Sequence, residues 1–343
     1  MPKIVKHGIT NAPREYIKNR KAKQSFFRLR GLTALKRALH HLFRGKSSKT
    51  PSVRTHERKT TPLPGLPPPT SQFQFIKSMG TGNFGKVCEI REFGTGRHLA
   101  AKFASADASR QATLHAEIQN ERDIMGILSK PGHPNLTTLQ GTLSENNVTY
   151  LLMDLGGPSL SSHLAAGKRF TPTQVASLMK QLISGIGYMR SQSIQHNDIR
   201  ADNLLYDGNV LKICDFGRAT KMGILQPTVV LNYMPPEVLS GCRSHNLDMW
   251  SAACLMVELL LGEQLVTRQQ LNVNDNNHIP LSRGDRNQMI RRQITEAAQR
   301  IEACAGKDAA QLFRGMTRLM KSRITPEEAL KSPFLAWLPT TAV

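Results

Sequence analysis

Apolar residues in the first half of the chain follow the two-residue repeat of strands. Lys86–Arg91 alternates between polar and apolar side chains, and Gly94–Gly96 then predicts a turn. Leu99–Phe103 and Tyr150–Leu155 are short apolar runs with the length of buried strands. The pattern therefore predicts a strand-rich region that ends near residue 155.

Helical spacing lies between these strands and returns after them. Three apolar residues lie three, four and seven positions after Glu121 and would give one helix an apolar face, which should end before Pro131. They are Ile124, Met125 and Leu128. Leu255–Leu261 is apolar but short and contains Glu258, so it predicts a buried helix and not a membrane span.

Two acidic motifs follow the predicted strands. Gln195–Leu205 reads QHNDIRADNLL, and Asp215–Gly217 follows ten residues later. In this order and spacing they resemble the catalytic loop and the metal-binding motif of the eukaryotic protein kinase family. The resemblance implies an α+β fold with a strand-rich small lobe and a helical large lobe, and phosphoryl transfer from ATP. It makes Asp198 the catalytic base, and Asn203 and Asp215 ligands of magnesium.

A glycine-rich segment precedes the alternating strand. Without Cβ atoms its three glycines would let the backbone lie close over a triphosphate. A dinucleotide-binding fold would need a helix directly after the glycines, whereas a strand is predicted here. The resemblance therefore makes this segment part of an ATP site. Its residues are Met79, Gly80, Thr81, Gly82, Asn83, Phe84, Gly85 and Val87.

Lys102 lies in an apolar strand after the glycines, and the resemblance implies that it reaches the α and β phosphates. Such a lysine needs an acidic partner from the next helix. Glu117 and Glu121 are one turn apart and compete for this role. Glu121 is preferred because the apolar residues after it turn its side of the helix inward, which leaves Glu117 on the surface.

Tyr150–Leu155 runs into two glycines, and in the family this segment is the hinge beside adenine. The resemblance makes Met153 the gatekeeper and brings the backbone of Asp154 and Gly156 to the adenine edge. Apolar side chains would enclose the base. They are Val87, Ala100 and Leu205.

Further motifs of the family follow. Met234–Val238 resembles the end of the activation segment, and Leu247–Cys254 resembles the helix whose aspartate, here Asp248, caps the catalytic loop. Arg323–Leu335 resembles the last helix, whose arginine pairs with the glutamate of the activation segment. The resemblance therefore predicts a buried ion pair between Arg323 and Glu237.

The resemblance covers residues 73–338, with the small lobe at 73–155 and the large lobe at 156–338. Most of the formal charge of +21 lies outside it, because residues 1–60 hold 17 lysines and arginines against two acids, a net charge of +15. Proline-rich residues 61–72 predict an extended linker. We expect the basic extension to bind a polyanion or an acidic partner.

The extension also carries apolar residues every three or four positions from Phe26 to Leu42, which predicts a basic amphipathic helix. Docking on the kinase domain, or nuclear import and nucleic-acid binding, ranks above binding to a membrane surface, and a mitochondrial-type leader is a further alternative. Five scattered cysteines predict neither a disulfide framework nor a zinc site. We expect an intracellular protein of the nucleus or cytoplasm, in a host cell if the divergent loops reflect a viral origin.

Two departures from the family bear on activity. Asn197 replaces the arginine that in many members binds a phosphorylated activation segment, which predicts constitutive activity. Arg200 stands where serine/threonine kinases carry lysine, and Arg200 followed by Ala201 looks more like some cytoplasmic tyrosine kinases. As a fixed cation Arg200 is expected to neutralise the γ-phosphate. Serine/threonine specificity is preferred over tyrosine because it is the larger class.

Two other functions fit the motifs less well. Small-molecule kinases share the His-x-Asp loop but lack motifs like Met234–Val238 and Arg323–Leu335. A pseudokinase scaffold would typically lack Lys102, Asp198 or Asp215, and all three are present. The sequence therefore favours an ATP-dependent protein kinase that acts on protein substrates.

Overall fold

The structure of the chain is a computed structural model. It describes residues 72–82, 85–104, 111–145, 148–222, 224, 231–239, 246–267, 270–271 and 282–336. The predicted basic extension, its amphipathic segment and the linker up to residue 71 lie outside the described residues.

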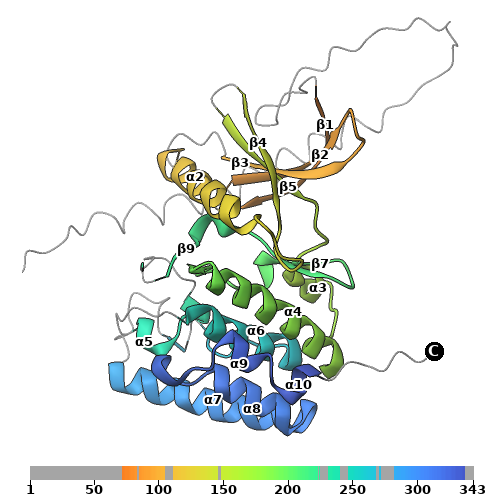
Figure 1. Ribbon diagram of the computed structural model, residues 1–343. Coiled ribbons are helices and arrows are strands. Elements are labelled where there is room, and N and C mark those ends of the chain that lie inside the picture. Colours follow the sequence, from red (N-terminus) through yellow and green to blue (C-terminus); the bar gives the residue numbers. More distant parts are fainter. Residues whose placement is uncertain are drawn as a thin grey trace, which may run out of the picture. The chain divides into compact units, whose positions relative to one another are not determined.

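The first described elements form an antiparallel five-stranded sheet in the order β1-β2-β3-β5-β4 (Figure 1). The three strands predicted from the pattern are confirmed as β2, β3 and β5, whereas β4 had no clear apolar signal. The strands are β1 Phe73–Gly82, β2 Gly85–Glu92, β3 His98–Phe103, β4 Leu139–Glu145 and β5 Val148–Asp154. The register sets Val87 opposite Lys102 and Ala100 opposite Met153.

Helix α2, Gln111–Leu128, lies against β4 and β5 (Figure 1). Its predicted apolar face is confirmed, because Ile124, Met125 and Leu128 are all buried. Glu121 is buried on the same side at 1 % exposure. The repeat that buries the apolar residues therefore carries a carboxylate into the interior.

The part of the chain after the sheet is mostly helical. Helix α4 starts with a capping box, in which Thr171 and Gln174 satisfy each other's backbone N–H groups. Helix α6 is buried along almost all its length and packs against α4, α7 and α8. The helices are α3 Leu160–Ala165, α4 Pro172–Ser191, α5 Pro236–Leu239, α6 Leu247–Leu261, α7 Arg283–Ala305, α8 Lys307–Met316, α9 Pro326–Ala329 and α10 Pro333–Ala336.

Short elements hold the loops between α4 and α5. Strand β6 (Ile194–Gln195) pairs with β9 (Thr220–Lys221), and β7 (Leu204–Tyr206) pairs with β8 (Leu211–Ile213). Three 3-10 turns lie among them and a fourth follows α8. They are η3 Ala201–Asn203, η4 Phe216–Arg218, η5 Leu231–Tyr233 and η6 Met320–Ser322. The sheet followed by helices confirms the predicted α+β fold.

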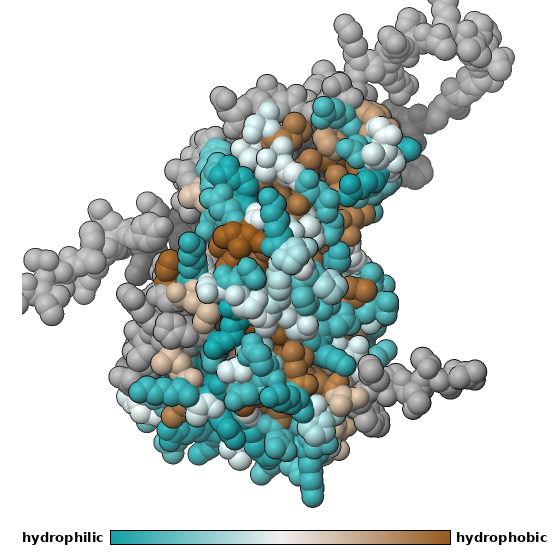
Figure 2. All heavy atoms as spheres, viewed as in Figure 1, coloured by the Kyte–Doolittle hydropathy of each residue, from teal (hydrophilic) through white to brown (hydrophobic). Residues whose placement is uncertain are grey.

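Hydrophilic side chains cover most of the face shown in Figure 2, with smaller groups of hydrophobic ones between them. Across the described ranges, no helix combines the length and the apolar character that crossing a membrane requires.

The predicted ion pair between Arg323 and Glu237 is confirmed. The Arg323 Nη2 and Glu237 Oε1 atoms are 2.8 Å apart, and the Arg323 side chain is fully buried. Arg323 also donates to the carbonyl oxygens of Asn246 and Arg318, each at 3.1 Å. One guanidinium therefore ties the end of the activation segment to the loop before α6 and to the last helices.

Removing this guanidinium should destabilise the fold strongly. The substitution Arg323→Ala leaves the largely buried Glu237 carboxylate without its cation, which we expect to cost about 3–5 kcal/mol of unfolding free energy. Denaturant unfolding measures it, with Arg300→Ala in the exposed Arg300–Glu263 pair as the control that should change little. Equal stability of the two variants would show that the buried pair contributes nothing specific.

Candidate active site

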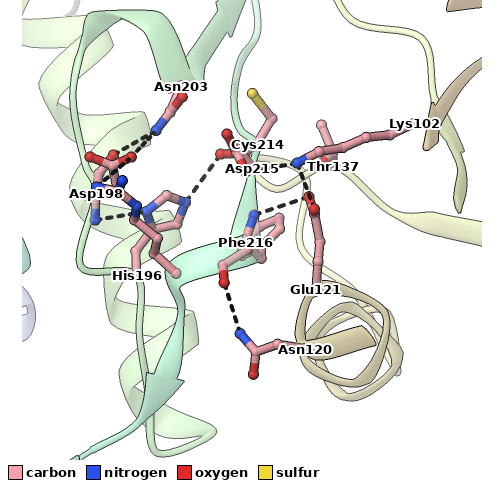
Figure 3. Close-up of polar contacts among 12 residues, drawn as sticks. Lys102, Asn120, Glu121, Thr137, His196, Asp198, Asn203, Cys214, Asp215 and Phe216 are labelled. Carbon is pink, nitrogen blue, oxygen red and sulfur yellow. Dashed lines mark hydrogen bonds and ion pairs between the residues drawn. The ribbon is translucent and has the colours of Figure 1, made fainter. Parts of the chain in front are cut away.

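Lys102 of β3 lies between two carboxylates (Figure 3). Its Nζ atom is 2.5 Å from Glu121 Oε2 and 2.8 Å from Asp215 Oδ1. Burial alone would lower the pKa of Lys102, but the two carboxylates raise it above its usual range. Lys102 is therefore a permanent cation that joins the sheet, helix α2 and the segment that starts at Asp215. The predicted partner Glu121 is thus in contact with Lys102, whereas Glu117, which was expected on the surface, is half-buried.

Helix α2 also fixes the backbone after Asp215. Glu121 Oε1 accepts a hydrogen bond from the Phe216 N–H at 3.2 Å. Asn120 Nδ2 donates to the carbonyl oxygens of Gly217 at 3.1 Å and Ala219 at 2.9 Å. These bonds hold Asp215 in the left-handed backbone conformation, with φ of 66°.

Asp248 of α6 holds the backbone of the catalytic loop. Its buried carboxylate accepts hydrogen bonds from the backbone N–H groups of His196 at 2.8 Å and Asn197 at 2.9 Å, which confirms the predicted cap. Burial raises the pKa of Asp248 to about 6, although the two N–H groups oppose this change. The loop backbone is thus anchored to the most buried helix of the fold.

His196 links the loop to the strand that precedes Asp215. Burial lowers its pKa to about 4, so the ring is neutral near pH 7. With the proton on Nε2, the ring donates to the Cys214 carbonyl at 3.1 Å and accepts from the Asp198 N–H at Nδ1, at 3.3 Å. Figure 3 shows this ring between Asp198 and Asp215.

Asp198 is held by Asn203 (Figure 3). Asn203 Nδ2 donates to the Asp198 carbonyl at 2.8 Å and to its Oδ2 atom at 3.1 Å. Burial raises the pKa of Asp198 to about 6, while Arg218 and Arg200 act in the opposite direction. A carboxyl group with this pKa is mostly ionised near pH 7 and can accept a proton more readily than an exposed aspartate.

A cavity of about 450 Å³ lies between the sheet and the catalytic loop, within the size range of small-molecule sites. Thirteen of the predicted residues line it. Asp198 is not among the lining residues but is hydrogen-bonded to Asn203, which is. The thirteen are Met79, Gly80, Gly85, Val87, Ala100, Lys102, Glu121, Met153, Asp154, Gly156, Asn203, Leu205 and Asp215.

Some predicted residues stand apart from the cavity. Arg200 is absent from its lining and forms an ion pair with Asp202. Thr81 and Gly82 end β1, and Asn83 and Phe84 lie outside the described residues.

The sequence reasoning also missed part of the lining. The additional residues are Thr137, Gly157, Pro158, Ser159, Ser162, Asp202 and Cys214. Gly157 and Cys214 adjoin motifs and could have been found by extending them. Thr137 and the two serines follow no repeat or motif that marks them.

Two glycines in the cavity wall pack closely, Gly85 against backbone and Gly156 against a side chain. Gly85 has φ of +123°, and a Cβ there would lie 2.3 Å from the Phe103 carbonyl oxygen. A Cβ on Gly156 would lie 2.3 Å from the Leu205 Cδ1 atom. The hinge therefore runs in direct contact with the floor of the cavity.

Residues with oxygen atoms suitable as magnesium ligands line the same cavity. Asn203 uses its amide nitrogen to hold Asp198, which leaves its Oδ1 as an acceptor. Asp215 contributes a carboxylate whose pKa Lys102 lowers against the effect of burial. Carboxylate and amide oxygens are the hard ligands that magnesium prefers.

Asn197 joins the catalytic loop to the segment after Asp215. It adopts φ of 66°, a left-handed conformation that asparagine tolerates. Its Nδ2 donates to the Arg218 carbonyl and to Thr220 Oγ1, each at 2.9 Å, and its Oδ1 accepts from Gln195 Nε2 at 2.7 Å. Neutral hydrogen bonds thus stand where many family members rely on arginine and phosphate.

Comparison with known proteins places these features in a family. The model of the protein kinase domain matches residues 73–335. A probable serine/threonine-protein kinase of Arabidopsis thaliana is 31% identical over 217 residues, which cover 59% of this chain and 36% of the relative. Cyclin-dependent kinase C-2 C of the same plant is 30% identical over 217 residues, which cover 59% of this chain and 32% of the relative.

A third relative matches a longer stretch. CBL-interacting serine/threonine-protein kinase 14 of Arabidopsis thaliana is 29% identical over 278 residues, which cover 77% of this chain and 58% of the relative. The chain thus spans about a third of the length of the first two relatives and somewhat over half of the third. Since the family model matches most of the chain, from the sheet to the last helix, the chain belongs to the protein kinase domain family.

Proposed function

We propose that the chain is an ATP-dependent protein kinase that transfers the γ-phosphate to serine and threonine hydroxyl groups of protein substrates. The contact of Lys102 with both Glu121 and Asp215 carries this proposal, because it assembles the groups that bind a triphosphate and its metal. The relatives named as serine/threonine-protein kinases support the residue class.

Adenine would bind at the inner end of the cavity. Val87 and Ala100 of the sheet and Leu205 of the large lobe line it and would enclose the base. Met153 limits its depth, and the backbone of Asp154 and Gly156 would contact the adenine edge. The glycine-rich segment would cover the phosphates, and Lys102 would bind the α and β phosphates.

Asn203 and Asp215 would hold magnesium, which neutralises phosphate charge when bound. Asp198 would accept a hydrogen bond from the substrate hydroxyl, orient it towards the γ-phosphate and take its proton. Arg200 is paired with Asp202, so its contribution to the γ-phosphate requires the guanidinium to leave or share that partner.

We further propose that the activity does not depend on phosphorylation of the activation segment. Thr220 is 7 % exposed, and its hydroxyl accepts from Asn197 and donates to the Ile224 carbonyl. A kinase acting on this chain would have to break these bonds to reach the hydroxyl. Asn197 supplies without charge the link that other kinases form with a phosphate.

The other function classes have less support. Small-molecule kinases would not need the Arg323–Glu237 link at the end of the activation segment. A pseudokinase scaffold would not need a buried lysine between two carboxylates, an arrangement that is costly unless it serves a purpose. Tyrosine specificity and serine/threonine specificity are distinguished by which amino acid of the protein substrate carries the phosphate after the reaction.

The substitution Asp198→Asn should abolish transfer and leave ATP binding largely intact. An amide cannot take the proton of the hydroxyl, so the rate should fall by roughly two to four orders of magnitude. Labelled ATP, magnesium and mixed protein substrates provide the assay, and Asp123→Asn on the exposed face of α2 is the control.

Hydrolysis of the labelled wild-type products then identifies the phosphorylated residue. We expect phosphoserine and phosphothreonine. Phosphotyrosine alone would contradict the residue class, and near-normal turnover of the Asp198 variant would contradict the assignment of the base.

Treatment with a phosphatase should leave the rate unchanged, because the link at Asn197 contains no phosphate. In contrast, Asn197→Ala should lower the rate, since it removes the bonds to the Arg218 carbonyl and Thr220. The rate of the wild type before and after phosphatase treatment tests the first statement. The rate of Asn197→Ala relative to the wild type tests the second, with Asn209→Ala in an exposed turn as the control. A large loss after dephosphorylation would mean that another basic group binds a phosphate.

We propose that residues 1–60 act as a tether for a polyanion, separate from catalysis. A chain that starts at Ser71 should keep its phosphotransfer rate and lose binding to heparin. For the full chain, this binding should weaken roughly a thousandfold between low and moderate salt if several charges are neutralised. If the truncated chain is inactive or melts earlier, the extension is instead a structural part of the kinase domain.

A further inference from the structure

Arg218 lies beside the catalytic carboxylate. Its Nη1 atom is 4.0 Å from Asp198 Oδ2, and 21% of its side chain is exposed. This distance is too long for a hydrogen bond, so the contact is one between charges. The guanidinium thus reaches the acceptor carboxylate and still borders solvent.

The backbone around Arg218 is fixed from two sides. Its carbonyl accepts from Asn197, and the carbonyls of its neighbours Gly217 and Ala219 accept from Asn120 of α2. The position of the residue is therefore set by the catalytic loop and by the small-lobe helix together. The Arg218 side chain extends from this fixed backbone to Asp198.

Arg218 and Arg200 both lower the pKa of Asp198, but they are placed differently. Arg200 is bound to the carboxylate of Asp202, which belongs to the same loop. Lys102 is shared by Glu121 and Asp215. In the described part of the chain, Arg218 is the cation within 4.0 Å of Asp198.

The acceptor hydroxyl must lie within hydrogen-bond distance of Asp198, at about 2.7 Å. Consecutive Cα atoms of a peptide are about 3.8 Å apart, so the residues next to the acceptor pass within a side chain's reach of Arg218. The planar guanidinium matches a carboxylate and would bind it with two hydrogen bonds.

We propose that Arg218 determines specificity by binding an acidic side chain of the substrate within two positions of the acceptor hydroxyl. The inference rests on the proposed protein kinase activity and names its substrate class, an acidic peptide. Lysine and arginine residues near the acceptor hydroxyl would be disfavoured, because their positive charges would lie close to the guanidinium of Arg218.

A serine-centred peptide library tests this inference. The full chain with magnesium and ATP is given peptides that carry either glutamate or glutamine at each of two positions on either side of the serine. At one of these positions we expect kcat/KM to be about tenfold higher or more for glutamate, the value of one charge-assisted hydrogen bond.

Variants then assign the preference to Arg218. The ratio between glutamate and glutamine peptides should fall to near one in Arg218→Gln, be retained in part in Arg218→Lys, and invert in favour of glutamine in Arg218→Glu. Because each ratio is taken within one variant, a general loss of rate does not affect it. Arg122→Gln, a change on the exposed face of α2, should keep the wild-type ratio.

The possible failures are separable. If the wild type phosphorylates no peptide and no mixed protein substrate, the proposed function fails. If it phosphorylates peptides without an acidic preference, or if Arg218→Gln keeps that preference, the role of Arg218 is wrong. A preference for phosphoserine over serine at these positions, with glutamate and glutamine equal, would replace the acidic side chain by a phosphorylated one.

Discussion

The contact of Lys102 with Glu121 and Asp215 is the interaction on which the rest of the site depends. A buried lysine is stable only while carboxylates surround it, and each buried carboxylate in turn needs the lysine. The three groups come from the sheet, from α2 and from the large lobe, so none of these parts can shift alone without stranding a charge. The ion cluster thereby fixes the width of the cavity and the place of Asp215 beside the catalytic loop.

Much of this arrangement could be predicted from the sequence, because it follows from short repeats and motifs. The choice of Glu121 over Glu117 needed only the helical period, which carried the carboxylate inward together with Met125 and Leu128. Strand β4 was not predicted, because it mixes polar and apolar residues at a sheet edge. The contact of Arg218 with Asp198 could not be predicted for a different reason. The two residues belong to separate loops, and the elements around these loops bring them together.

The departures from the family motifs are absorbed locally. Within the motif Leu247–Cys254, Ala253 stands where glycine is usual in the family. It is fully buried in α6 and does not disturb the cap that Asp248 places on the loop. Asn197 adopts a left-handed backbone conformation, and its side-chain amide forms hydrogen bonds with three neighbouring residues. In each case a small side chain fits a tightly bonded position, so the geometry survives although the chemistry of the position has changed.

The contact between the hinge and the cavity floor has a consequence for how this chain can evolve. Gly156 leaves no room for a methyl group because Leu205 already occupies that space. A larger residue at the hinge would therefore require the Leu205 side chain to turn away or to be replaced by a smaller one. Homologous chains should show these two distant positions changing size in opposite directions, a correlated substitution that reflects one shared volume beneath the nucleotide base.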